Sequence, residues 1–227
     1  TSFFRDPKIF QTVTQNVFPA VLKNKPSADP IRIWVAGCST GEEVYSLAIS
    51  LHLFLEKISG RQIQIFASDI SEAAIAKARI GSYRSGDLKN IPDTILKNYF
   101  TKNSGSYQVN KQIRDMCVFA IHDFLKDPPF AKMDLISCRN VLIYMDTFLQ
   151  KRALSTFHYA LKENGFLLLG KSETTGPAAE LYSTFEKDDK IYARKLVPNN
   201  FMHYKTDRKK LILTDKIKKT VKYELPK

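Results

Sequence analysis

Short apolar runs alternate with amphipathic segments along most of the chain. Residues Ile31–Val35 form an apolar run that ends at Ala36-Gly37, which predicts a buried strand entering a turn. Behind it, apolar side chains from Val44 to Ile58 recur at helical spacing. The same signals predict, in order, a strand over Ile63–Ala67, a helix from Ser71 to about Ala78, a strand over Met133–Cys138, a helix from Asp146 to about Leu161 and a strand over Phe166–Leu169. This alternation predicts an α/β fold with a mostly parallel sheet and helices on both faces.

The middle and the end of the chain depart from this alternation. Ser106–Val109 and Met116–Ile121 predict strands of a small antiparallel insert, which follows a short helix near Thr94–Tyr99. Tyr182–Phe185 and Lys190–Lys195 predict a late pair of antiparallel strands. We therefore expect one domain over residues 1–198, with a small β-subdomain at about 101–121, followed by a basic tail or linker over 199–227.

Residues suited to begin or end a helix stand at several of the predicted boundaries. Ser39 to Glu42 and Thr40 to Glu43 both have the spacing of a capping box, Ser71 and Asp146 are expected as N-caps, and Gly81 is expected to end a helix.

The composition is typical of one globular domain. The chain has 227 residues, of which 44% are hydrophobic and 26% charged, so disordered, collagen-like and coiled-coil classes are excluded. It has no apolar run long enough to span a membrane, and Thr1–Pro7 lacks the apolar stretch of a signal peptide. Its three cysteines have no CxxC spacing, which favours a reducing cytoplasm, and its four scattered histidines form no metal box, so no metal is expected.

The net charge of +12 is concentrated at the end of the chain. Asn199–Lys227 contains nine Lys/Arg and three Asp/Glu, which is half of the net charge. Such a stretch could be an arm for nucleic acid or for an acidic partner, or a solvated linker at a domain edge. We favour the linker and expect no nucleic-acid partner.

Three polar clusters follow predicted strand ends: Ala36–Glu42, Asp69 and Arg139-Asn140. Ligands of open α/β sheets bind beyond the carboxyl ends of the strands, so these clusters should converge. The Gly37–Glu42 loop matches neither the phosphate loop nor the dinucleotide fingerprint, and its acids would repel phosphates. It suits a ligand with an ammonium group or a sugar. The alternative, favoured for Glu43, is a capped helix whose glutamates interact favourably with the positive end of the helix dipole.

The other two clusters also have two interpretations. Asp69 could accept hydrogen bonds from both ribose hydroxyls of a nucleoside, or it could cap the next helix. Arg139 and Tyr144 could bind a carboxylate, because a guanidinium forms a fork with it and a phenol donates to it. Taken together, the clusters favour the binding of a nucleoside without phosphates.

Three separated strings carry a family resemblance: TSFFRD at 1–6, WVAGCSTGEEVYSLA at 34–48 and SCRNVLIY at 137–144. They resemble the CheR family, the S-adenosylmethionine-dependent methyltransferases that esterify glutamates of chemoreceptors. The similarity covers about residues 1–195, and the stretch from Met116 to Arg139 looks most like the CheR part of hybrid proteins that also carry a methylesterase part. The resemblance implies a Rossmann-like class I methyltransferase fold.

The resemblance also implies roles for individual residues. Glu42, Arg139 and Asn140 would line the methionine end of the cofactor, Asp69 the ribose, and Asp123 and Phe124 the adenine, where the chemotaxis enzymes usually have Asn-Leu. Thr1 and Arg5 would lie over the cofactor, Gly37 beside it, and Tyr144 would contact the substrate carboxylate together with Arg5.

The implied function is transfer of a methyl group from S-adenosylmethionine to chemoreceptor glutamates by a cytoplasmic protein-glutamate O-methyltransferase. A methyltransferase for small-molecule acids and a non-catalytic S-adenosylmethionine-binding signalling module are the alternatives. Family members carry a helical domain before the first string, which is expected to be absent because this chain begins at Thr1. The expected partner is a methyl-accepting chemoreceptor or a similar signalling protein, with fused methylesterase or sensor domains as a further expectation.

Overall fold

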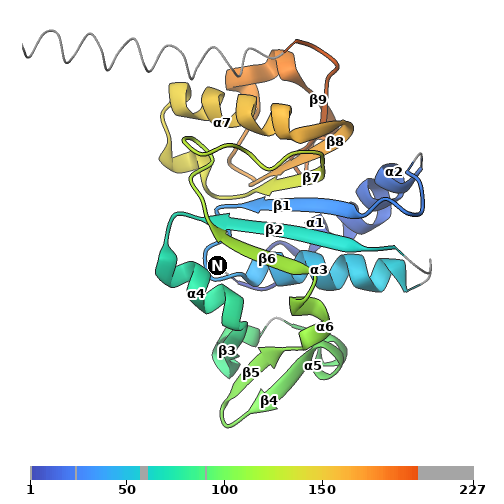
Figure 1. Cartoon of the computed structure of the whole chain (residues 1–227), viewed down its shortest axis with the longest axis vertical. Coiled ribbons are helices and arrows are strands. Elements are labelled where there is room, and N and C mark those ends of the chain that lie inside the picture. The colour runs from blue at the N-terminus through green and yellow to red at the C-terminus, as the bar shows by residue number, and fades with distance from the viewer. Residues whose placement is uncertain (1, 24, 57–60, 90, 199–227) are drawn as a thin grey trace, which may run out of the picture.

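A seven-stranded sheet crosses the molecule in the computed structural model, which describes all residues except 1, 24, 57–60, 90 and 199–227 (Figure 1). The strand order is β6-β2-β1-β7-β8-β10-β9. The strands are β1 (Ile31–Ala36), β2 (Ile63–Asp69), β6 (Cys117–Ile121), β7 (Met133–Cys138), β8 (Leu161–Leu169), β9 (Tyr182–Glu186) and β10 (Ile191–Arg194). Strands β6, β2, β1, β7 and β8 are parallel, whereas β10 is antiparallel to both β8 and β9. The predicted mostly parallel sheet and the late antiparallel pair are therefore confirmed.

Helices cover both faces of the sheet because β1 buries side chains in both directions. Ile33 and Val35 belong to a core cluster with α3 (Glu42–Leu55) and α4 (Glu72–Ile80). Trp34 belongs to a second cluster with α7 (Thr147–Ala160), and its ring lies 5.4 Å from that of Phe157. A strand buried on both faces is what an almost continuous apolar run predicts.

The first thirty residues contain helical elements for which the sequence analysis predicted none. They are α1 (Pro7–Thr12), a π-helical turn η1 (Val13–Val17) and α2 (Phe18–Leu22). Ile9, Val13 and Val17 are fully or almost fully buried in the same cluster as α3. This packing fixes the N-terminal segment next to the carboxyl end of β1.

A small antiparallel sheet projects from the domain, in the order β3-β5-β4 (Figure 1). Its strands are β3 (Ser82–Arg84), β4 (Phe100–Asn103) and β5 (Ser106–Val109), flanked by η2 (Ser85–Leu88), α5 (Asp93–Tyr99) and α6 (Lys111–Arg114). The expected membership of Met116–Ile121 in this insert is wrong, because β6 pairs in parallel with β2, from Ile65 opposite Cys117 to Asp69 opposite Ile121. A short apolar run shows that a strand exists but does not specify its partner. The domain boundary at residue 198 and the tail over 199–227 stay predictions, and the tail lies outside the described residues.

The helix boundaries confirm two of the predicted N-caps. Ser71 accepts from the amide of Ala74 at the start of α4, and Asp146 accepts from the amide of Leu149 at the start of α7. Both expected capping boxes at the start of α3 are wrong, since the N-cap is Gly41 at φ 93°, with no side-chain cap. A left-handed N-cap favours glycine, which makes a tight turn between β1 and α3.

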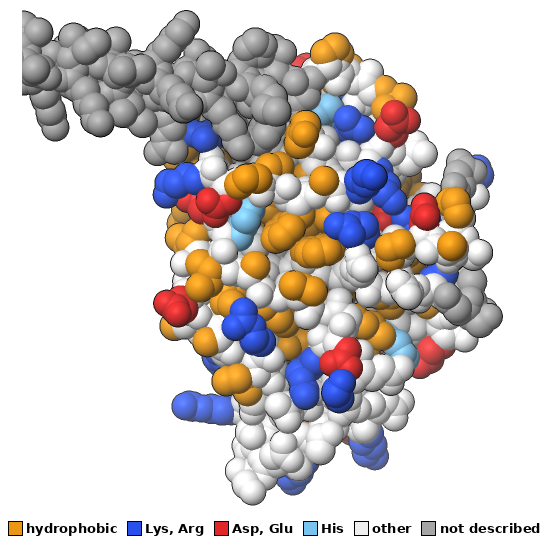
Figure 2. Space-filling model, in the orientation of Figure 1, with side chains coloured by type: hydrophobic (Ala, Val, Ile, Leu, Met, Phe, Trp, Pro, Cys, Tyr) orange, Lys and Arg blue, Asp and Glu red, His pale blue; other side chains and the backbone are white. Residues whose placement is uncertain are grey.

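The segment between β6 and β7 lies over the sheet as an irregular loop. The Phe130 ring lies 5.2 Å from Trp34, 5.1 Å from Phe66 and 4.9 Å from His122. Figure 2 shows hydrophobic side chains grouped over the middle of this face. The loop at Asp127-Pro128-Pro129 thus carries an aromatic residue that closes the core.

Candidate functional site

The carboxyl ends of β1, β2, β6 and β7 surround one cavity of about 330 Å³. Six of the residues predicted for the site line it: Gly37, Asp69, Asp123, Phe124, Asn140 and Tyr144. Ile70, His122, Leu125, Val141 and Met145 complete the lining. The expected convergence of the strand-end clusters is thus confirmed for Gly37, Asp69 and Asn140, although the individual roles of all six residues stay predictions.

Gly37 lets the loop after β1 pass close to the loop after β7. Its φ of +72° is in the left-handed region, and a Cβ atom there would lie 2.6 Å from Cγ2 of Val141. A side chain at this position would therefore be strained and would displace Val141 from the cavity wall.

Asp69 lies at the end of β2 and holds two loops together. Its Oδ2 accepts from the amide of Ser39 at 2.8 Å and its Oδ1 from the amide of Ser71 at 2.9 Å. An ionised carboxylate has about four acceptor positions, so Asp69 retains capacity to accept from the hydroxyls of a sugar. Ser71 supplies the N-cap of α4, so the alternative that Asp69 caps this helix is wrong.

Asp123 and Phe124 form the wall that follows β6. Asp123 accepts from the amide of Leu125 at 2.9 Å and pairs with Lys126 at 2.7 Å. Burial raises its pKa, but the hydrogen bonds from Lys126 and Leu125 outweigh burial, so the pKa of Asp123 is lowered. Phe124 is 8% exposed and its ring lies 5.2 Å from Phe157, so it also belongs to the core.

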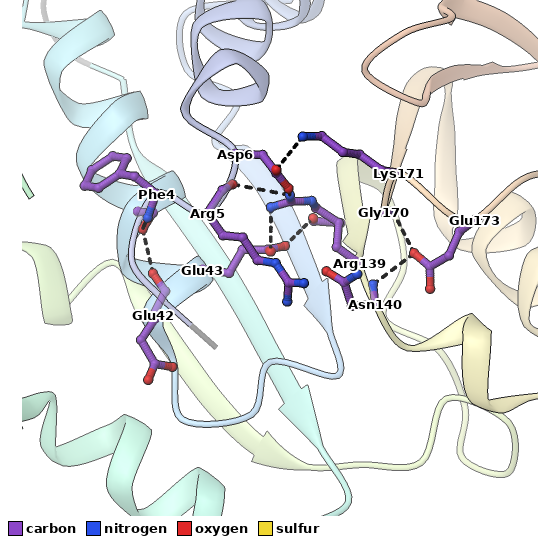
Figure 3. Close-up of polar contacts among 12 residues, drawn as sticks. Phe4, Arg5, Asp6, Glu42, Glu43, Arg139, Asn140, Gly170, Lys171 and Glu173 are labelled. Atoms are coloured by element: carbon purple, nitrogen blue, oxygen red, sulfur yellow. Dashed lines mark hydrogen bonds and ion pairs between the residues drawn. The ribbon is translucent and has the colours of Figure 1, made fainter. Parts of the chain in front are cut away.

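Arg139 is not among the residues that line the cavity, and its predicted place at the methionine end of a cofactor stays a prediction. Its guanidinium, 1% exposed, pairs with Glu43 at 2.9 Å and with Asp6 at 2.8 Å, and it donates to the carbonyl of Arg5 at 3.3 Å (Figure 3). Glu43 also accepts from the hydroxyl of Ser137 at 2.6 Å. The guanidinium thus joins Asp6 and the Arg5 carbonyl to Glu43, so Arg139 anchors the N-terminal segment beside the end of β7.

Asp6 joins this anchor to a second cation. Lys171 pairs with the other oxygen of Asp6 at 2.6 Å. The hydrogen bond from Lys171 lowers the pKa of Asp6, burial opposes it, and the charges of Arg139 and Lys171 lower it further. The side chain is therefore ionised over the physiological range, and the ion pairs hold the segment in place.

Arg5 is exposed on the anchored segment, between Phe4 at φ 47° and Asp6 at φ 60°. In Figure 3 its guanidinium lies between Glu42 and Asn140, and among the described residues it has no ion-pair partner. A free guanidinium held at a strained turn is suited to an anionic ligand.

Glu42 is buried at 5% exposure, and both its oxygens accept from the hydroxyl of Thr40 at 2.8 Å. It is not part of the cavity lining, and its predicted role stays a prediction. Thr1, also predicted for the site, lies outside the described residues.

Two cysteines lie at the carboxyl ends of neighbouring strands: Cys38 follows β1 and Cys138 is the last residue of β7. Both thiols are buried, at 3% and 0% exposure. Burial raises the pKa of Cys38 to about 12 and that of Cys138 well above its ordinary value. Thiols that stay protonated and covered have a packing role.

Sequence reasoning missed four residues that shape the site. Each of them contacts a partner that is remote in the chain; Glu43 and Arg139, for example, are 96 positions apart. The four residues are Asp6, Glu43, Lys171 and Glu173. Asp6 could have been found because it ends the string TSFFRD at 1–6. Glu173 could have been found because it is an acid close to Gly170, just after a predicted strand end.

A mostly parallel sheet with helices on both faces and a cavity at the carboxyl ends of its strands has the architecture of a Rossmann-type domain. The chain matches the model of the family "CheR methyltransferase, SAM binding domain" over residues 1–191. It belongs to this family, so the predicted family membership is confirmed.

Relatives extend over most of the chain. An uncharacterized 104.1 kDa protein in the hypE 3' region of Rhodobacter capsulatus is 38% identical over 85% of this chain and 20% of its own length. Chemotaxis protein methyltransferase 2 of Vibrio cholerae is 32% identical over 80% of this chain and 64% of its own length. Chemotaxis protein methyltransferase 1 of Pseudomonas aeruginosa is 32% identical over 80% of this chain and 68% of its own length. The chain thus spans a fifth to about two thirds of the length of these relatives.

S-adenosylmethionine is the cofactor that defines the family, as predicted. The cavity fits its adenosyl part, because Asp69 offers acceptors for a ribose and Phe124 offers an apolar surface for a base. Among the described residues, no helix is long and apolar enough to cross a membrane.

Proposed function

We propose that the chain transfers methyl groups from S-adenosylmethionine to glutamate side chains of chemoreceptors, giving glutamyl methyl esters in the cytoplasm. The observation that carries the proposal is the cavity at the strand ends, with Asp69 and Tyr144 among its lining residues. Tyr144 is 84% exposed although it is aromatic, which suits a residue that meets a second molecule. The names of the chemotaxis relatives support a receptor as that molecule.

The acceptor needs no base. A glutamate carboxylate has an ordinary pKa of about 4.3, so it is an anionic nucleophile at neutral pH. When bound, S-adenosylmethionine supplies an electrophilic methyl group.

The chain's own residues orient the acceptor and hold the site together. The guanidinium of Arg5 and the hydroxyl of Tyr144 position the carboxylate for in-line attack, because both donate hydrogen bonds to oxygen. The ion pairs of Arg139 with Asp6 and Glu43 keep Arg5 near the strand ends. The loops at Gly37 and Asn140 exclude water from one side of the cavity.

Radiolabel transfer tests the proposal. The chain is incubated with S-adenosylmethionine labelled in the methyl group and with a chemoreceptor cytoplasmic domain. We expect label on the receptor that mild base releases as methanol, which is diagnostic of an ester. Base-stable label, or transfer only to small-molecule acids, contradicts it. Binding of S-adenosylhomocysteine without transfer to any acceptor supports the non-catalytic module.

Two variants separate binding from chemistry. Tyr144→Phe removes one exposed hydroxyl, so turnover should fall while the affinity for S-adenosylhomocysteine stays unchanged. Arg5→Ala removes a charge and should lower turnover further. Lys102→Ala, at an exposed position on β4, is the control. Wild-type turnover in both Arg5→Ala and Tyr144→Phe rules out their orienting role.

A further inference from the structure

Glu173 is a buried carboxylate whose partners are main-chain amides. It lies between β8 and the 3-10 helix η4 (Gly176–Leu181), and it is 4% exposed. Its Oε2 accepts from the amides of Asn140 at 2.9 Å and Gly170 at 2.6 Å, and its Oε1 from those of Val141 at 2.8 Å and Leu142 at 2.7 Å. About four acceptor positions are all that a carboxylate has, so its capacity is filled.

These bonds set the backbone of the loop that follows β7. Three consecutive amides of this loop point at one carboxylate, which requires Asn140 to adopt a φ of +59°. A left-handed conformation is costly for a residue other than glycine and persists only where its surroundings enforce it. The conformation directs Asn140 and Val141 into the cavity wall, and Tyr144 follows in η3 (Leu142–Tyr144).

Gly170 is shaped to the same arrangement. A Cβ atom at this position would lie 2.7 Å from Oε2 of Glu173 and 3.0 Å from the amide nitrogen of Asn140. Only glycine therefore lets the end of β8 approach the loop so closely. Figure 3 shows Glu173 and Gly170 beside Asn140, on the side of Asn140 away from Glu42.

We propose that Glu173 is a positioning residue for the cofactor, because its buried carboxylate gathers the amides of residues 140–142 and so holds Asn140 and Val141 in the cavity wall. Glu173 is not among the residues that line the cavity, so it acts through the loop. The inference rests on the proposed cofactor cavity and not on the identity of the methyl acceptor. Radiolabel transfer by the wild-type protein tests the acceptor, whereas cofactor affinity in Glu173 variants tests the inference, so one result can be negative without the other.

Glu173→Gln tests the inference with a side chain of equal size. Its amide presents one oxygen and one nitrogen that donates, so two of the four main-chain amides lose their acceptor. We expect the affinity for S-adenosylhomocysteine, measured by calorimetry on folded protein, to fall about tenfold or more. Hydrogen exchange of the amides of 140–142 should accelerate, while exchange in β2 stays unchanged. Glu180→Gln, at an exposed glutamate of η4, should leave both unchanged.

A purely structural role predicts a different result: a lower melting temperature with wild-type affinity below that temperature. That result overturns the inference. Gly170→Ala is a second variant in case Glu173→Gln does not fold, since it keeps the charge but separates Glu173 from Asn140. It should weaken S-adenosylhomocysteine binding in the same way, and wild-type affinity in folded Gly170→Ala also overturns the inference.

Discussion

Replacing Arg139 with methionine distinguishes an anchor from a cofactor ligand. The substitution keeps an unbranched apolar side chain but removes the guanidinium that pairs with Glu43 at 2.9 Å and Asp6 at 2.8 Å. Glu43 would retain only the hydroxyl of Ser137 among the partners described above, and Asp6 would retain Lys171. We therefore expect a large loss of stability.

The magnitude follows from burial. The guanidinium is 1% exposed, and the carboxylates of Asp6 and Glu43 are 24% and 20% exposed. Removing one partner of a buried ion pair costs about 3–5 kcal/mol, because the remaining charge stays desolvated. For a domain of this size, a loss of 1 kcal/mol lowers the melting temperature by about 2–4 °C, so Arg139→Met should lower it by at least about 6 °C.

Urea unfolding measures the effect, with the single tryptophan, Trp34, as a fluorescent probe in the core. The double variant Arg139→Met/Glu43→Met should recover part of the stability, because it removes one unpaired carboxylate. Lys102→Met, at an exposed position, is the control and should be neutral. If Arg139→Met is destabilised by less than about 1 kcal/mol, a value typical of exposed pairs, and instead loses affinity for S-adenosylhomocysteine, the anchoring role is refuted.

Three further predictions concern the cofactor site, the thiols and pH. Asp69→Asn should weaken binding of S-adenosylhomocysteine by about 1.5–3 kcal/mol in calorimetry, the range for a hydrogen bond to a charged group; unchanged affinity removes Asp69 from the site. Iodoacetamide should alkylate Cys38 and Cys138 slowly, and equally with and without S-adenosylhomocysteine, because burial raises the pKa of both thiols; fast labelling that the ligand blocks, seen by mass spectrometry, contradicts a packing role. Burial lowers the pKa of His158, the hydrogen bond to the Lys195 carbonyl opposes this and the charge of Arg194 adds to it. The unfolded chain therefore protonates His158 at a higher pH than the folded chain does. The stability that neutral His158 contributes is complete above the ordinary pKa of 6.5, and it is lost as the pH falls toward the lower pKa of the folded state. Urea unfolding of His158→Asn should show a weaker pH dependence in that window, and parallel profiles exclude His158 as the cause.

The sequence was sufficient for features that depend on local pattern. The strands β1, β2 and β7 and the caps at Ser71 and Asp146 follow from runs of neighbouring residues. The rule that ligands bind at strand ends predicts that Gly37, Asp69 and Asn140 lie close together, and all three line the cavity.

What the sequence did not reveal depends on distant partners. The run Met116–Ile121 predicted a strand, but its pairing with β2 is decided by the sheet as a whole. The ion pair of Arg139 with Glu43, 96 positions earlier, was not predicted. The capping boxes failed because a left-handed Gly41 occupies the N-cap of α3. No local pattern contains these contacts.

A crystal structure with S-adenosylhomocysteine tests the central claim most directly. The account predicts density in the cavity at the carboxyl ends of β1, β2 and β7, with the ribose hydroxyls within hydrogen-bond distance of Asp69 and the adenine beside Phe124. Density at another place, such as the cavity lined by His52, Arg61 and Phe66 near the other ends of the strands, would contradict it.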